Sequence, residues 1–338
     1  MLREVQTHFD DPDGNFVEQF HTTGFDARTF ELFLFAMFRE SGHIVDRTHA
    51  RPDFLLSKDG VCAAIEAVTA NPPATASGNP YRTLPLPRTE QEQVAYLQNE
   101  VAIRLGSPLF TKLKQRYWEL PHVSGRPLVI AIQSFHAPGS LMISSTPLGH
   151  YLFGYRQRWF HDEKAQLIIS EEPIDVHRGT KEIPSGFFSQ PEAENISAVL
   201  FCNTGTIPKF NRMGHEGKYH SSGVRMLRYG TCYRHDPNAT LPMAFLYEVG
   251  NPDELGETWR EGTVLFKNPR ARYPIPTEWL GASAEQEFAD GQSVTTFADP
   301  FHPYWSLTEN FKRWSFPPGR VQRRAKQIVS ALKEDFPD

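Results

Sequence analysis

The chain has 338 residues, of which 39% are hydrophobic and 22% are charged, and its formal net charge is −5 with a pI near 6.2. This composition supports a packed core and excludes a globally disordered chain. It also excludes an overall basic protein of the kind that coats nucleic acid, so any basic contact surface must be local. Because a typical domain has roughly 100–200 residues, we expect one core domain with a large elaboration, or two domains that share an interface.

The cysteine content and the hydropathy pattern indicate a reducing compartment. Cys62, Cys202 and Cys232 show no CxxC spacing, which argues against a disulfide framework and against a cysteine-based zinc site. The first residues lack the charged and then apolar pattern of a signal peptide, and no long apolar run predicts a membrane span. We therefore expect a cytoplasmic protein with no membrane partner.

The first third of the chain alternates between helical and strand-like patterns. Residues 26–43 are predicted to form an amphipathic helix. Three strand-like runs follow, at residues 43–49, 52–57 and 61–70. Residues 71–90 are rich in proline and small residues, and are expected to form a long loop.

A second helix is predicted for residues 89–117, with an interruption around residues 106–108, and a strand follows at residues 125–136. Beyond residue 137 the pattern is less clear. Four further strand-like runs are QLIIS, ISAVLFC, MAFLYEV and GTVLF. Residues 319–336 are predicted to form a short amphipathic helix with an apolar stripe made of Val321, Ile328, Val329 and Leu332.

Two acids occur in strand-like runs that are otherwise apolar. Asp59-Gly60 between these runs is a strong signal for a two-residue hairpin turn. Counting outward from this turn places Asp53 directly opposite Glu66 on the same face of the hairpin. Like charges in such positions destabilise a sheet, and removal from water increases that penalty. We therefore expect a cation between them.

Glu31 lies on the apolar stripe of the first helix, which should face the sheet. It would add a third carboxylate to Asp53 and Glu66, and three converging carboxylates are typical of a site for Mg²⁺ or Mn²⁺. The alternative is a site without metal. Glu66 would then pair with a buried arginine such as Arg51 or Arg104, Asp53 would be a turn residue, and Glu31 would extend its carboxylate to solvent.

With these residues in place, the sequence resembles the PD-(D/E)XK, or restriction-endonuclease-like, superfamily. The family core is a helix, three strands, a helix and a strand, which is the order predicted between residues 26 and 136. The matching residues are Pro52-Asp53 for the PD acid, Glu66-Ala67-Val68 for the third-strand tripeptide, and Glu31 for the glutamate of the first helix. The resemblance implies an α/β restriction-endonuclease-like core over residues 1–137, with residues 138–338 forming an α+β extension packed on it.

The sequence departs from the family at Val68, where the family has a lysine that helps to position or activate the attacking water. Members of the superfamily are known to move that lysine to a neighbouring element. Candidates are Lys112 and Lys114 in the second helix and, less favoured, Lys58 at the hairpin tip. We take Lys112 as the catalytic lysine because a helper group must reach the reacting phosphate; a solvated basic face is the ordinary alternative.

Two basic segments could contact a nucleic-acid backbone. Lys209 and Arg212 lie in a polar, glycine-containing segment that fits no P-loop pattern, and an ordinary long loop is the alternative. Arg323 and Arg324 lie in the C-terminal helix, although most such runs are solvated faces.

The resemblance implies hydrolysis of phosphodiester bonds in nucleic acid, with DNA as the expected partner, Mg²⁺ or Mn²⁺ as cofactor, and Asp53, Glu66 and Lys112 as catalytic residues. A role in restriction, phage defence or repair, as a homo-oligomer or with a partner subunit, follows only by analogy between folds. Val68 leaves open a catalytically silent module that binds nucleic acid or protein. A hydrolase acting on another phosphate ester is a third possibility.

Overall fold

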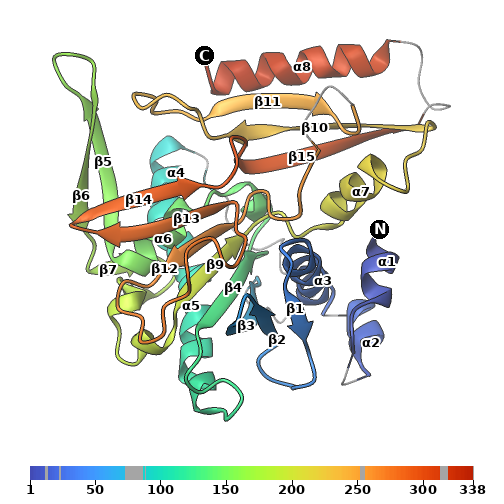
Figure 1. Ribbon diagram of the computed structural model, residues 1–338. Helices are drawn as coiled ribbons and strands as arrows, with labels where there is room; N and C mark the ends of the chain where they lie inside the picture. Colours follow the sequence, from blue (N-terminus) through green and yellow to red (C-terminus); the bar gives the residue numbers. More distant parts are fainter. Residues whose placement is uncertain are drawn as a thin grey trace.

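An eight-stranded mixed sheet with helices on both faces lies at the centre of the fold (Figure 1). The computed structural model describes residues 1–11, 14–22, 24–72, 87, 89–251, 256–312 and 319–337. Most of the loop predicted at residues 71–90 lies outside these ranges. Within them, no helix combines the length and the apolar composition that a membrane crossing requires. The structure, a large mixed sheet with several helices, confirms the α/β class expected from the sequence.

The first elements follow the predicted order of one long helix and three strands. In chain order they are α1 (Leu2–Thr7), α2 (Phe16–Phe20), α3 (Phe25–Glu40), β1 (Ile44–Asp46), β2 (Phe54–Lys58) and β3 (Val61–Ala70). The helix α3 forms where a helix was predicted, but its residues from Thr29 to Phe38 are all buried, so this stretch is covered on all sides and is not amphipathic.

The second predicted helix is continuous, and the interruption expected around residues 106–108 is wrong. It consists of α4 (Glu90–Ala95), the π-helical turn η2 (Tyr96–Glu100) and α5 (Val101–Lys114). Pro108 lies inside α5. A proline removes one backbone hydrogen bond, but Leu105 and Leu109 on either side of it are almost fully buried against the sheet, and this packing keeps the segment helical.

The central sheet includes strands from both predicted parts of the chain. Its order is β1-β2-β3-β4-β9-β12-β13-β14. The pairs β3–β4, β4–β9 and β12–β13 are parallel, and the other neighbours are antiparallel. The strands beyond the first hairpin are β4 (Leu128–Ser134), β9 (Ala198–Cys202), β12 (Val264–Lys267), β13 (Ala284–Ala289) and β14 (Gln292–Phe297). The division predicted at residue 137 therefore runs through one sheet.

The hydrophobic core has two layers, one on each face of this sheet. On one face α3 packs against alternate residues of β3, including Ala63 and Ile65. On the other face α5 and α6 (Thr146–Phe153) pack against the intervening residues, including Ala64. All residues of β4 are buried, as expected for a central strand covered on both sides.

A separate three-stranded sheet carries the C-terminal helix (Figure 1). Its order is β11 (Met243–Glu248), β10 (Val224–Cys232) and β15 (Pro303–Lys312), with α8 (Arg320–Asp335) packed on it. Of the stripe predicted for α8, Val321, Ile328 and Leu332 are buried, whereas Val329 is 37% exposed.

The remaining described elements are two hairpins, one helix and four short 3-10 turns. They are β5 (Tyr155–His161) with β6 (Leu167–Pro173), β7 (Val176–Arg178) with β8 (Glu182–Pro184), α7 (Ile207–Glu216), η3 (Tyr117–Glu119), η4 (Ser140–Met142), η5 (Phe187–Ser189) and η6 (Ala193–Asn195). The four later strand-like runs correspond to β6, β9, β11 and β12.

Candidate functional site

The β2–β3 hairpin has the register predicted from its turn. Asp59 and Gly60 form the turn with φ angles of 50° and 76°, the left-handed region that a type I′ turn requires. The pairing runs in the predicted register from this turn out to the first residue of β2. Asp53 directly precedes β2 and therefore lies beside Glu66 of β3.

Both acids belong to the sheet face that α5 covers. One step closer to the turn, Leu55 and Ala64 are Cα partners and pack in the core beneath α5. Since side chains alternate between the faces of a strand, Asp53 and Glu66 follow on the same face. The predicted pair of neighbouring carboxylates is therefore present in the structure.

The environment of Asp53 disfavours its ionised form. Its Oδ2 accepts a hydrogen bond of 2.7 Å from the amide of Ala67, which fixes its position against β3. Burial raises the pKa of Asp53 to about 8, and the neighbouring charges of Glu66 and Glu31 add to the shift. Like charges and desolvation both oppose ionisation. Asp53 is therefore the group at this site whose charge most needs a compensating cation.

Glu66 is buried and has two partners, Lys112 near the end of α5 and Tyr117 in the turn η3 that follows it. Its Oε1 contacts the Nζ of Lys112 and lies 2.8 Å from the hydroxyl of Tyr117, which donates to it. The lysine predicted to replace the missing family lysine at Val68 is thus brought to the acid pair. Lys114 points elsewhere, with its Nζ 4.3 Å from the ring centre of Phe110.

Tyr117 was not singled out by sequence reasoning. Arg116 adopts a left-handed conformation with φ of 51° immediately after α5, and this sharp turn directs the next residue back toward β3. Burial raises the pKa of Tyr117, and Glu66 raises it further, so the phenol stays protonated as a donor. The left-handed φ of Arg116 cannot be recognised from the sequence. No sequence pattern therefore indicated that Tyr117 would reach Glu66.

Glu31, the third predicted metal ligand, is paired with two arginines in this structure. Glu31 is close enough to influence Asp53, but its two oxygens lie 2.9 and 2.7 Å from Nη1 of Arg28, and the second also lies 3.5 Å from Nη2 of Arg47. Two guanidinium groups therefore already neutralise it. Its helix also packs on the opposite face of β3 from α5 (Figure 1).

The remaining two acids fit a divalent cation. Within the described ranges, Oδ1 of Asp53 and Oε2 of Glu66 make no hydrogen bond, so each acid keeps one oxygen for a ligand. Mg²⁺ binds through one or two carboxylates and completes its shell with water and substrate oxygens. In the same part of the chain no group of three His, Cys, Asp or Glu side chains could hold a metal ion. A two-carboxylate site fits this arrangement, and a third ligand from Glu31 stays a prediction.

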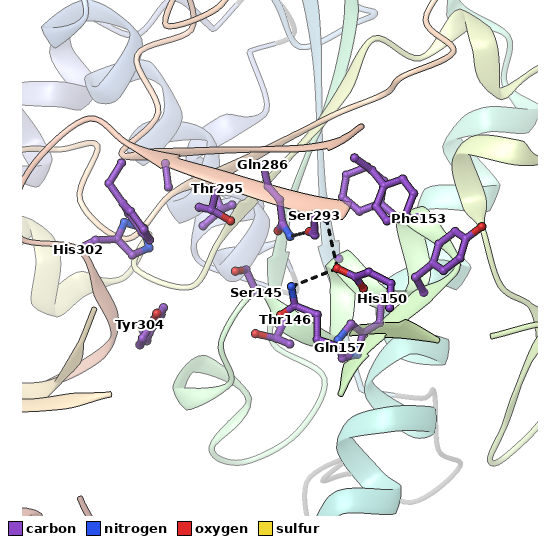
Figure 2. Close-up of a pocket in the computed structure, with 17 residues that line it drawn as sticks. Ser145, Thr146, His150, Phe153, Gln157, Gln286, Ser293, Thr295, His302 and Tyr304 are labelled. Carbon is purple, nitrogen blue, oxygen red and sulfur yellow. Dashed lines mark hydrogen bonds between the residues drawn. The ribbon is translucent and has the colours of Figure 1, made fainter. Parts of the chain in front are cut away.

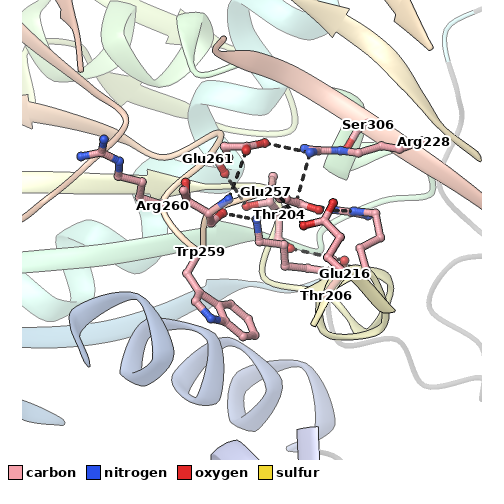
Figure 3. A network of polar contacts seen from close by, with 12 residues as sticks. Thr204, Thr206, Glu216, Arg228, Glu257, Trp259, Arg260, Glu261 and Ser306 are labelled. Carbon is pink, nitrogen blue, oxygen red and sulfur yellow. Dashed lines mark hydrogen bonds and ion pairs between the residues drawn. The ribbon is translucent and has the colours of Figure 1, made fainter. Parts of the chain in front are cut away.

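Lys209 and Arg212 are not surface residues, so the prediction that they contact nucleic acid does not fit the structure. Lys209 is fully buried, with Nζ 2.6 Å from Oε1 of Glu257, and Arg212 Nε lies 2.7 Å from the other oxygen of the same carboxylate. Arg228 completes the cluster at 3.2 Å from Glu257 and 2.7 Å from Glu261 (Figure 3). Burial alone would raise the pKa of Glu257, but these cations hold it well below its usual value.

This cluster joins α7, β10 and the segment that precedes β12. Its cations are buried and cannot contact a phosphate backbone, so their role here is structural. Sequence reasoning placed Lys209 and Arg212 in a loop because the segment is polar and contains glycines, whereas the structure places both in α7.

Arg323 and Arg324 are exposed on α8, as a nucleic-acid contact requires. Arg324 pairs with Glu309 of β15 at 2.5 Å. In Figure 1, α8 lies at the top of the molecule and the β2–β3 hairpin near the bottom. The structure therefore does not bring these two arginines to the acid pair, and their contact with nucleic acid stays a prediction.

Comparison with known proteins adds no relative to this description. No family model, no curated protein and no solved structure matches the chain. The function must therefore be argued from the geometry at Asp53, Glu66 and Lys112.

Proposed function

We propose that this protein hydrolyses phosphodiester bonds in nucleic acid, with DNA as the substrate class, and that residues 1–137 form a restriction-endonuclease-like core. The observation that carries the proposal is the meeting of Asp53, Glu66 and Lys112 on one face of the β2–β3 hairpin. The element order of helix, three strands, helix and strand supports the proposed core.

The two acids would hold the Mg²⁺ ion through their free oxygens. When bound, such an ion lowers the pKa of a coordinated water and neutralises charge on the scissile phosphate. The amide of Ala67 holds Asp53 in place, and Tyr117 orients Glu66. Because the pKa of Asp53 is raised to about 8 without metal, the proton and the cation would compete for this carboxylate.

Lys112 would act on the substrate. Its ammonium contacts Glu66, and its side chain is 21% exposed, so it can exchange part of this contact for a phosphate oxygen. A cation aimed at the phosphate stabilises the negative charge that develops during attack. Arg51 is exposed two residues before Asp53 and is available to bind the neighbouring backbone phosphate.

A second function is favoured by the ion pairs of the same site. Lys112 neutralises Glu66, and Arg28 and Arg47 neutralise Glu31, so protein cations already compensate two of the three acids. Such a site can be stable without catalysis. This observation supports the alternative of a silent nucleic-acid-binding module that keeps the fold.

The deciding experiment is a cleavage assay on plasmid DNA, phage DNA and RNA with Mg²⁺ or Mn²⁺, and with EDTA as the control. Asp53→Ala and Glu66→Ala should each abolish cutting, and Lys112→Ala should slow it. Lys114→Ala is the matched control, because this lysine lies two residues away on the same helix and points at Phe110. Wild-type protein that binds DNA but cuts no nucleic acid with any divalent ion would establish the silent module.

A further inference from the structure

A second candidate site lies far along the sheet from the acid pair. It is a partly open cavity of about 160 Å³, bordered by α6, the β5–β6 hairpin, β13–β14 and the start of β15 (Figure 2). Val264 and Ala284 belong to its apolar lining. Gly149 allows α6 to approach closely, since a Cβ there would lie 2.9 Å from the ring of Phe266.

The lining of this cavity is polar and nearly uncharged. Among the described residues it contains no lysine or arginine, and its one carboxylate is Glu171. That carboxylate is already engaged, with Oε1 accepting at 3.2 Å from both the amide of Gln157 and the backbone N–H of Ser293. A phosphate or carboxylate ligand would meet no cation here and one negative charge. The cavity is therefore unsuited to an anion.

Two histidines, His150 and His302, belong to the lining (Figure 2). Burial lowers the pKa of both His150 and His302 to about 4, so both imidazoles are neutral at physiological pH. His302 Nδ1 lies 2.6 Å from the hydroxyl of Ser283, which leaves Nε2 for a ligand. A neutral imidazole offers one donor and one acceptor, so the pair provides both kinds of contact.

Several polar atoms of the lining have no protein partner. In the described part of the chain, neither ring nitrogen of His150 makes a hydrogen bond, and Gln286 uses its amide nitrogen on Ser293 but leaves its carbonyl oxygen free. Both residues are half-buried and line the cavity, so these atoms are available to a ligand that enters it. Phe153 provides an aromatic wall beside them (Figure 2).

We propose that this cavity binds one uncharged, planar heterocycle with alternating hydrogen-bond donors and acceptors, of the size and class of a pyrimidine base. A cavity of about 150 Å³ holds a single six-membered aromatic ring, which matches the volume here. Neutral imidazoles and an amide can read the edge of such a ring while an aromatic wall stacks on its face. The ring could come from a free base or from a base that is turned out of a nucleic-acid strand. Neither source requires the cleavage reaction proposed above.

The test is calorimetric titration of the full chain with uracil, cytosine and thymine, using glucose and benzoate as probes of the same size. The pyrimidines should bind, and glucose and benzoate should not. Thr295 and Thr296 are both exposed on β14, but only Thr295 lines the cavity. Thr295→Trp should therefore weaken binding at least about tenfold, while the matched control Thr296→Trp should leave it unchanged.

Gln286→Leu should also weaken binding about tenfold through the lost hydrogen bond, and thermal melts of all three variants report whether they fold. Short oligonucleotides that carry one pyrimidine among abasic sites distinguish a free base from a base turned out of a strand. They should bind only if the cavity accepts a pyrimidine that is still attached to a nucleic-acid strand. Asp53→Ala should bind pyrimidine like the wild type, which separates this site from the proposed cleavage site. The proposal is overturned if no pyrimidine binds, if glucose binds equally well, or if Thr295→Trp has no effect.

Discussion

The substitution Asp53→Asn should stabilise the protein at alkaline pH in the absence of metal. The pKa of this carboxyl rises from its ordinary value of 3.8 to about 8 on folding, through burial and then through the charges of Glu66 and Glu31. Asparagine removes the charge and keeps an oxygen that can accept the hydrogen bond from Ala67, which spans 2.7 Å in the wild type. The variant therefore isolates the electrostatic penalty.

The magnitude follows from proton linkage. An acid whose pKa is raised in the folded state binds its proton more tightly there than in the unfolded chain. Stability is therefore highest at low pH and falls by about 1.4 kcal/mol per pH unit between the unfolded and the folded pKa. From 3.8 to about 8, the total is on the order of 5 kcal/mol. The variant should match the wild type near pH 4 and exceed it increasingly up to about pH 8.

The assay is urea unfolding in EDTA at intervals from pH 4 to pH 9. The free energy of unfolding of the variant is compared with that of the wild type at each pH, provided that the two have the same m value. Asp59→Asn is the matched control, because Asp59 is an exposed acid of the same hairpin in a turn position that asparagine tolerates. Added Mg²⁺ should stabilise the wild type at pH 8 by binding the ionised folded form, and should not stabilise Asp53→Asn. Parallel pH profiles for wild type and Asp53→Asn would show that this carboxyl is not strained, and the argument for a cation site would fail.

Three further outcomes follow from the same contacts. Glu257→Gln removes the charge that faces three buried cations, so it should lower the free energy of unfolding by about 3–5 kcal/mol, measured by urea denaturation. Tyr117→Phe removes one hydrogen bond to Glu66 and should destabilise by about 0.5–1.5 kcal/mol; an unchanged melting temperature would mean that the contact is not formed in solution. Arg324→Ala breaks an exposed pair with Glu309 and should change stability by less than about 1 kcal/mol. If this arginine contacts DNA, its loss should reduce the slope of log K against log salt concentration by about one, which corresponds to one phosphate contact. Fluorescence anisotropy titrations at several salt concentrations measure this slope.

Local sequence determined the order of the elements in the first third of the chain and the acid pair. Asp59-Gly60 has few alternatives to a type I′ turn, and a two-residue turn sets the register of both strands, so the neighbouring positions of Asp53 and Glu66 could be predicted without tertiary information. The same holds for α8, whose buried residues recur at helical spacing.

Tertiary structure decided which charges meet when their residues are far apart in the sequence. Glu31 and Arg47 are sixteen residues apart and contact each other only because α3 packs beside β1. Lys209 and Glu257 come together from segments 48 residues apart, and their burial turned a predicted surface contact into a structural cluster. No local pattern encodes such pairs, because the free energy that places a charge inside a protein comes from its distant partners. The continuation of the sheet from β4 into β9 and β12 is likewise a pairing between distant strands, and it joins the two parts that were predicted to divide at residue 137.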